Sequence, residues 1–154
     1  MINLIGKGLG CPVGSVIVGS KQIIERAIRV RKVLGGGWRQ AGVLAAAGLY
    51  ALDHQVDRIK DDHEHAKMME EMINSEGRGK FVVKRRDTNL VIVRVDPSVA
   101  TPEEIVAKLQ AGPVCVLGIE FASTEFRLTF HCDISQQLAL MACDKMKEVI
   151  KNYN

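Results

Sequence analysis

Residues 80–104 read KFVVKRRDTNLVIVRVDPSVATPEE, and this stretch decides the fold of the C-terminal part of the chain. Two runs rich in β-branched residues predict strands, separated by a turn at Asp87 and Thr88. The TPEE segment predicts the start of a helix, because Thr101 suits the N-cap position and Glu104 the third helical position of a capping box. A strand pair followed by a helix is therefore expected here.

The residues after this helix repeat the pattern of two strands and a helix. The first helix is expected to stop at a Gly-Pro pair, with further strands at about 114–120 and 125–131. A last helix is expected to open at DISQ, residues 133–136, which is a capping pattern. From about residue 76 onward the expected order is β-β-α-β-β-α, typical of a compact α+β layer structure.

The N-terminal part of the chain predicts helices but little sheet. The run CPVGSVIVGS, residues 11–20, predicts a short buried strand, and apolar residues at helical spacing predict a helix over 21–34 that ends at three glycines. A second helix is expected from near Trp38, and because its body is apolar on every side it should be buried. A more polar helix is expected over 54–74. The segment before it has no sheet to pack on, so we expect it to be a piece of a larger domain.

Composition and charge argue against several classes of function. Hydrophobic residues make up 47% and charged residues 25% of the 154 residues, as in ordinary soluble domains. A net charge of +3 and 5% aromatic residues do not favour a nucleic-acid partner, and the longest apolar run, 42–52, is too short to span a membrane. The four cysteines are scattered without a CxxC pair, and no targeting segment is visible. A soluble cytoplasmic protein with reduced thiols is therefore expected.

Two glycine-rich stretches carry basic residues that could hold a ligand. Lys7 stands among four glycines in MINLIGKGLGCPVGS, which fits either a loop that holds a group against its backbone or a surface turn with a solvated lysine. Between residues 21 and 39, six basic residues and one acidic residue give a net charge of +5 beside the GGG run. This segment fits a phosphate or carboxylate site, with Lys32 and Arg39 flanking the glycines, or a solvated basic helix face.

Strand periodicity divides the segment EFRLTFHCD into two faces. One face carries Phe126, Leu128 and Phe130, and the other carries Arg127, Thr129 and His131. Arg127 either reaches solvent from an open sheet or binds a carboxylate. The stretch DDHEH is not expected to bind a metal, because His63 and His65 point in nearly opposite directions on a helix, and His63 is expected to be half-buried. No metal site is expected in the chain.

Four stretches together resemble the region around the cofactor lysine of threonine aldolases. They are KGLG-PVGS and RK-LGGG-RQAG near the N-terminus, DTNLVIV at 87–93 and RLTFHCDIS at 127–135. Threonine aldolases are pyridoxal-phosphate enzymes of the aspartate-aminotransferase fold, grouped with the aromatic β-eliminating lyases. The resemblance runs from about Lys7 to the C-terminus and covers roughly the C-terminal half of such an enzyme.

The resemblance implies a role for each candidate residue. Lys7 matches the lysine that forms the Schiff base with pyridoxal 5'-phosphate, the implied cofactor. Lys32 and Arg39 match basic positions that help to hold the cofactor phosphate and the substrate, partly across a subunit interface. Arg127 matches the arginine that binds the substrate α-carboxylate, which also fits its place opposite the phenylalanines.

The implied fold class is α/β, a partial pyridoxal-phosphate-dependent transferase fold. The end of the large domain with a linking helix is expected over 1–53, and a small α+β domain over 54–154. The implied activity is cleavage of the Cα–Cβ bond of L-threonine or L-allo-threonine to glycine and acetaldehyde, in a complete chain that forms a homo-oligomer such as a tetramer. The alternative is a non-catalytic truncated fragment, or a docking partner of a full-length aldolase. Two positions depart from the family: Gly6 replaces a usual serine, and Trp38 replaces a common methionine.

Overall fold

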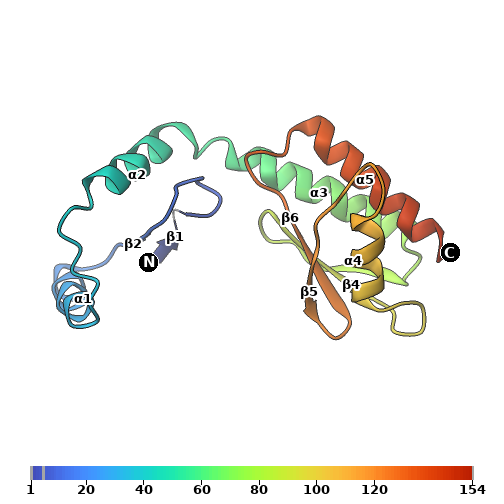
Figure 1. The fold of residues 1–154 in the computed structure, drawn as a ribbon, viewed down its shortest axis with the longest axis horizontal. Coiled ribbons are helices and arrows are strands. Elements are labelled where there is room, and N and C mark those ends of the chain that lie inside the picture. The colour runs from blue at the N-terminus through green and yellow to red at the C-terminus, as the bar shows by residue number, and fades with distance from the viewer. Residues whose placement is uncertain (1, 5, 154) are drawn as a thin grey trace. The chain divides into compact units, whose positions relative to one another are not determined.

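The chain divides into two compact units, Met1–Ile59 and Lys60–Asn154 (Figure 1). The computed structural model describes the backbone of residues 2–4 and all of residues 6–153. Each unit has a hydrophobic cluster of its own.

The second unit contains a four-stranded antiparallel sheet and three helices. Its strands are β3 (Phe81–Arg85), β4 (Leu90–Val95), β5 (Ile119–Ala122) and β6 (Glu125–Thr129), in the sheet order β3-β4-β6-β5. The helices are α3 (Ile59–Glu76), α4 (Pro102–Gln110) and α5 (Gln136–Lys151). The predicted order β-β-α-β-β-α from about residue 76 is confirmed.

The core of this unit lies between the helices and one face of the sheet. Every second residue of the central strands is buried, including Val91 and Val93 in β4 and Phe126 and Leu128 in β6. This alternation places one face of each strand on the core, as the period of two requires. Each helix adds one buried stripe, and the helical residues of the core are Ala66, Met69, Ile73, Ile105, Val106, Leu109, Ala139, Cys143, Met146, Val149 and Ile150.

The helix starts of the second unit use side-chain caps. The Thr101 hydroxyl accepts from the Glu104 N–H at 3.3 Å, and the Glu104 carboxylate accepts from the Thr101 N–H at 3.2 Å, so the predicted capping box is confirmed. The predicted cap of α5 is wrong by two residues. Ser135 caps this helix instead of Asp133, because its hydroxyl accepts from the Leu138 N–H at 3.3 Å.

The first strand of the second hairpin is shorter than predicted. The sequence predicts a strand over about 114–120, but β5 begins only at Ile119. The N–H of Val116 donates to the carbonyl of Leu109 at 2.9 Å, so this stretch is bound to the end of α4 rather than to the sheet. The hydrogen bonds of a segment decide its structure here more than its β-branched composition does.

The first unit contains a short antiparallel strand pair and two helices. Its strands are β1 (Ile2–Leu4) and β2 (Ser15–Ile17), and its helices are α1 (Lys21–Val33) and α2 (Gly42–His54). The buried hydrophobic residues that the structure describes in it are Leu9, Cys11 and Ala51. This cluster is small for a unit of 59 residues.

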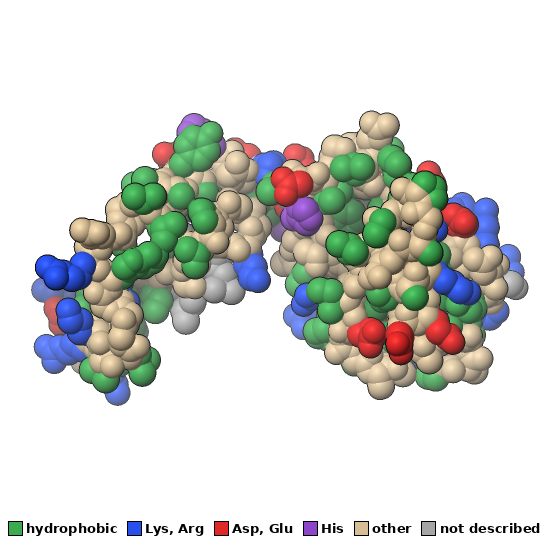
Figure 2. Space-filling view, viewed as in Figure 1, with side chains coloured by type: hydrophobic (Ala, Val, Ile, Leu, Met, Phe, Trp, Pro, Cys, Tyr) green, Lys and Arg blue, Asp and Glu red, His purple; other side chains and the backbone are tan. Residues whose placement is uncertain are grey.

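Two burial predictions for the first unit are wrong. Val16 and Ile17 of β2 are 43% and 45% exposed, and Val43 and Leu49 of α2 are 83% and 65% exposed. An apolar segment becomes buried only where another layer covers it, and the described part of this unit places no layer over these side chains. Figure 2 accordingly shows apolar side chains on the surface over α2.

The predicted domain boundary after residue 53 falls inside a helix. α2 continues to His54, and the polar helix predicted from that residue starts only at Ile59. Ile59 packs against the cluster of the first unit, so this unit extends to Ile59. In the described part of the chain, none of the helices combines the length and the apolar character that crossing a lipid bilayer requires.

Candidate functional site

Lys7 lies in a tight glycine-rich loop between β1 and β2. The N–H of Gly10 donates to the carbonyl of Lys7 at 2.8 Å, and the N–H of Gly6 donates to the carbonyl of Gly14 at 3.4 Å. Gly10 and Gly14 have φ angles of 73° and 140°, which side chains of L-residues rarely permit. The curvature of the loop therefore depends on glycine, and it leaves the Lys7 side chain exposed.

The loop is attached to α2 and to the turn after it. Leu9 and Cys11 of the loop are buried, and the Cys11 thiol lies 3.6 Å from the carbonyl oxygen of Ala47. Nη2 of Arg58 donates to the carbonyl of Gly8 at 3.1 Å. The carbonyl of Gly8, the residue after Lys7, is thus held by a charged hydrogen bond, and the residues that follow it are held by burial.

Gly6 is a departure from the family that the loop geometry explains. A Cβ atom at this position would lie 3.3 Å from the Cα of Val13 and 3.4 Å from the carbonyl oxygen of Cys11. These contacts are tighter than ordinary van der Waals contact. A serine would therefore require the opposite side of the loop to move slightly.

The three-glycine turn after α1 brings Lys32 against its own backbone. Gly35 has a φ angle of 79°, and a Cβ at Gly37 would lie 2.6 Å from the Cδ of Lys32, so the lysine stem occupies the space that a side chain would need. The Trp38 N–H donates to the carbonyl of Gly36 at 2.8 Å, which continues the turn. The helix predicted from near Trp38 therefore starts later, at Gly42.

The cationic groups that flank this turn are open to solvent. Lys32 and Arg39 are both exposed, and Figure 2 shows Lys and Arg side chains gathered over α1. Exposed cations beside glycine backbone can bind an anion such as a phosphate. Lys7, Lys32 and Arg39 all lie in the first unit.

Arg127, the fourth predicted site residue, lies on β6 in the second unit. Its register partners are Ile92 on β4 and Ile119 on β5, so it lies on the sheet face opposite Phe126. The side chain is half-buried, and its Nε is a buried donor with no hydrogen-bond partner among the described residues. An unpaired buried donor is costly, and a carboxylate is the ligand that would satisfy a guanidinium best.

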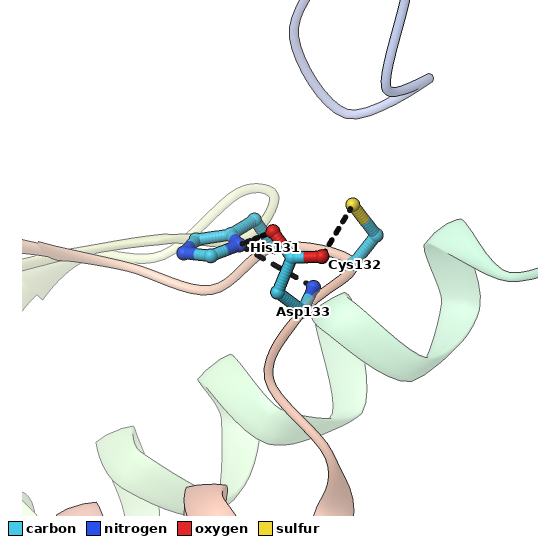
Figure 3. A group of neighbouring side chains, drawn as sticks. All are labelled: His131, Cys132 and Asp133. Carbon is cyan, nitrogen blue, oxygen red and sulfur yellow. Dashed lines mark hydrogen bonds and ion pairs between the residues drawn. The ribbon is translucent and has the colours of Figure 1, made fainter.

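A cluster that the sequence analysis missed lies where β6 leads into α5. His131, Cys132 and Asp133 place their ligand atoms within 4.8 Å of one another, with the carboxylate between the ring and the thiol (Figure 3). The Asp133 N–H donates to Nδ1 of His131 at 3.4 Å, and the carboxylate of Asp133 lies 3.5 Å from the same nitrogen. All three side chains are exposed, so the cluster lacks the buried setting that would hold a metal in a fixed geometry.

The stretch DDHEH, residues 61–65, contains two buried residues that the helical periodicity did not indicate. Asp62 and His65 are 1% and 5% exposed, while His63 is half-buried as predicted. Nε2 of His65 lies 3.0 Å from the side-chain oxygen of Gln136, and Nδ1 of His65 is buried without a hydrogen-bond partner among the described residues. His65 therefore connects α3 to the start of α5.

Known proteins of similar sequence include low-specificity L-threonine aldolases. The chain is 45% identical over 139 residues to the low-specificity L-threonine aldolase of Escherichia coli strain K12, and this match covers 90% of the chain and 39% of that protein. It is 41% identical over 133 residues to a probable low-specificity L-threonine aldolase of Arabidopsis thaliana, which covers 85% of the chain and 37% of that protein. The chain thus spans about two fifths of the length of the relatives it matches.

A solved structure and a family model agree with this similarity. The 8-amino-7-oxononanoate synthase of Francisella tularensis matches with a TM-score of 0.66 at 17% identity, over 98% of this chain and 45% of that one. At that identity the match shows the fold alone, a part of the pyridoxal-phosphate-dependent transferase fold. The model of the beta-eliminating lyase family matches residues 4–98, which include the Lys7 loop, α1, α2 and the first hairpin of the second unit. The chain belongs to the beta-eliminating lyase family.

Proposed function

We propose that this chain supplies part of the active site of a lyase that cleaves the Cα–Cβ bond of L-threonine or L-allo-threonine to glycine and acetaldehyde. The similarity to threonine aldolases supports the reaction class. Because the chain spans 39% of the Escherichia coli relative, we expect activity only together with the remaining part of such an enzyme. The proposed active form is a homo-oligomer, with a small amino acid as substrate and without nucleic acid or membrane as partner.

The residues of the first unit fit pyridoxal 5'-phosphate, the cofactor that the family implies. The exposed Lys7 offers a primary amine on a loop whose shape is fixed. Lys32 and Arg39 offer exposed positive charge beside the three-glycine turn, which suits a phosphate. When bound, this cofactor supplies a ring that accepts the electrons released at the substrate Cα.

The unpaired Nε of Arg127 is the observation that supports the proposal best. A buried guanidinium nitrogen without a partner costs free energy in the free chain, and a substrate α-carboxylate would remove that cost by accepting from it. The Nε atom is buried, and a hydrogen bond that is shielded from water is stronger than an exposed one. We therefore assign Arg127 to carboxylate binding and orientation of the substrate.

Covalent trapping tests the assignment of Lys7. The purified chain is incubated with pyridoxal 5'-phosphate, reduced with borohydride and mapped by mass spectrometry. We expect the label on Lys7, no label at this position in Lys7→Ala, and unchanged labelling of Lys7 in the control Lys21→Ala, since Lys21 is an exposed residue at the start of α1. Labelling spread evenly over the exposed lysines would contradict the proposal.

A second measurement tests Arg127. Addition of L-threonine to the cofactor-loaded chain is expected to change its visible absorbance, and Arg127→Met is expected to weaken threonine binding by about tenfold to a hundredfold, the range for a lost charge-assisted hydrogen bond. Arg94→Met is the matched control, because Arg94 is exposed on the neighbouring strand β4. Equal threonine binding by Arg127→Met and the wild type would contradict the assigned role.

The exposed apolar surface of the first unit favours a second candidate function. No residue of α1 is buried, and α2 leaves Val43, Leu49 and Tyr50 more than half exposed. Such a surface fits a non-catalytic chain that docks on a full-length aldolase. Sedimentation velocity of the chain, alone and with a full-length aldolase of the same source, tests this candidate. Binding that Leu49→Glu abolishes, without cofactor trapping at Lys7, would favour docking over catalysis.

A further inference from the structure

Arg58 forms a bridge between the turn after α2 and the loop that carries Lys7. Its Nε donates to the side-chain oxygen of Gln55 at 3.0 Å, and its Nη2 donates to the carbonyl of Gly8 at 3.1 Å. Gln55 is the C-cap residue of α2, so the guanidinium is itself oriented by a helix end. The contact joins residues that are 50 positions apart in the sequence.

The contact with Arg58 adds to the two backbone hydrogen bonds of the Lys7 loop, whose glycines offer no side chains for packing. A Cβ placed at Gly8 would meet no atom within 4 Å, so a side chain at this position would have no neighbour to pack against. A glycine loop also loses more conformational entropy on ordering than other segments do. Leu9 and Cys11 fix the far side of the loop by burial, and Arg58 fixes the residue directly after Lys7.

We propose that Arg58 is a positioning residue for Lys7, which holds the backbone of the loop so that the amine projects in one direction. The planar guanidinium suits this task, because its donors lie in a fixed fork that reaches two acceptors at once. A lysine at position 58 could reach the Gly8 carbonyl but could not hold that fork. The inference rests on the proposed role of Lys7, and it adds a residue to the active-site support.

The test compares Arg58→Met and Arg58→Lys with the wild-type chain. The first readout is the initial rate of borohydride-trapped labelling of Lys7 by pyridoxal 5'-phosphate, relative to Lys21 in the same sample. The second is amide hydrogen exchange of Gly10, whose N–H donates to the Lys7 carbonyl. Arg29→Met, which removes an exposed arginine of α1, is the matched control.

We expect Arg58→Met to lower the relative labelling of Lys7 about tenfold, as the loss of one charged hydrogen bond implies, and to speed exchange at Gly10. Arg58→Lys should restore part of the labelling, and Arg29→Met should change neither readout. Unchanged exchange at Gly10 in Arg58→Met would overturn the inference, and so would faster exchange with unchanged labelling. Absence of Lys7 labelling in the wild type would instead count against the proposed function, while exchange at Gly10 would still decide whether Arg58 holds the loop.

Discussion

Cys143 lies in the core of the second unit, where its thiol is protected from reaction. Burial, together with the neighbouring Asp144 carboxylate, raises the pKa of this thiol to about 11. Because the thiolate is the reactive form, the raised pKa alone lowers its fraction near neutral pH by about a hundredfold. Cys115 and Cys132 are exposed. We expect iodoacetamide to modify these two first and Cys143 only after unfolding.

Peptide mapping by mass spectrometry over a time course measures these rates, with a sample in denaturant as the control in which burial no longer matters. Equal rates for Cys143 and Cys132 in the folded chain would show that the thiol is reached without unfolding, contrary to its place in the core.

An ion pair joins Glu76 at the end of α3 to Lys147 on α5, with Nζ 2.5 Å from Oε1. The hydrogen bond from Lys147 holds the pKa of Glu76 below its usual value, and the same bond raises the pKa of Lys147. The lowered carboxyl pKa adds stability that is lost as pH falls through it, and the raised amine pKa adds stability that is lost as pH rises through it. The ion pair therefore stabilises the fold at pH values between the pKa of Glu76 and the pKa of Lys147.

Glu76→Gln is accordingly expected to lower the melting temperature at neutral pH by a small amount, since the pair is partly exposed, and to have less effect as the pH falls to about 3. Thermal unfolding followed by circular dichroism across this range measures the difference. Glu120→Gln, at an exposed position of β5, is the control. A destabilisation that is the same at neutral and acid pH would contradict the charge-based explanation.

At the level of single residues, the sequence predicted the strand face on which a side chain lies, but it did not predict the contacts of that side chain. The period of two placed Arg127 opposite Phe126, and the register confirms that placement, although the role of Arg127 stays a prediction. The unpaired Nε could not be predicted, because it depends on how Arg127 packs between β4 and β5, the strands on either side of β6. The bridge from Arg58 to Gly8 was missed for the same reason, since no local pattern marks it.

Among the helices, α4 offers the clearest test of a local signal. Thr101→Ala removes the hydroxyl that accepts from the Glu104 N–H, and we expect it to lower the free energy of unfolding of the second unit by about 1 kcal/mol. Urea unfolding followed by circular dichroism measures this change. Thr88→Ala, at an exposed turn position between β3 and β4, should have a smaller effect, and an equal loss in both variants would contradict a capping role.

Elements with strong local signals were predicted well, and elements that depend on neighbours were not. The hairpin of β3 and β4 and the start of α4 follow from strand periodicity and from the capping box, both of which are local. The start of β5 depends on a hydrogen bond between Val116 and Leu109, and the exposure of α2 depends on what covers it. Neither the start of β5 nor the exposure of α2 can be read from the residues of that element alone.

At the scale of the whole chain, the two units differ in how completely they are packed. In the described part of the chain, the second unit buries residues from all three of its helices and from its central strands in one cluster. The first unit buries Leu9, Cys11 and Ala51, and it leaves large apolar side chains of α1 and α2 exposed. Apolar burial is the main favourable term in folding, so the stability of the chain is expected to come chiefly from the second unit.

A truncated chain of residues 60–154 is therefore expected to fold alone, because its core uses side chains from within that range. It should unfold cooperatively in urea at nearly the same midpoint as the second unit does in the full chain. Hydrogen exchange of the full chain gives the matched comparison: amides of β4 and β6 should exchange slowly and those of α1 quickly, since α1 buries no residue. Slow exchange across α1 would show that the first unit is itself stably folded, contrary to its small core. Loss of cooperative unfolding on truncation would show that the first unit contributes to the stability of the second.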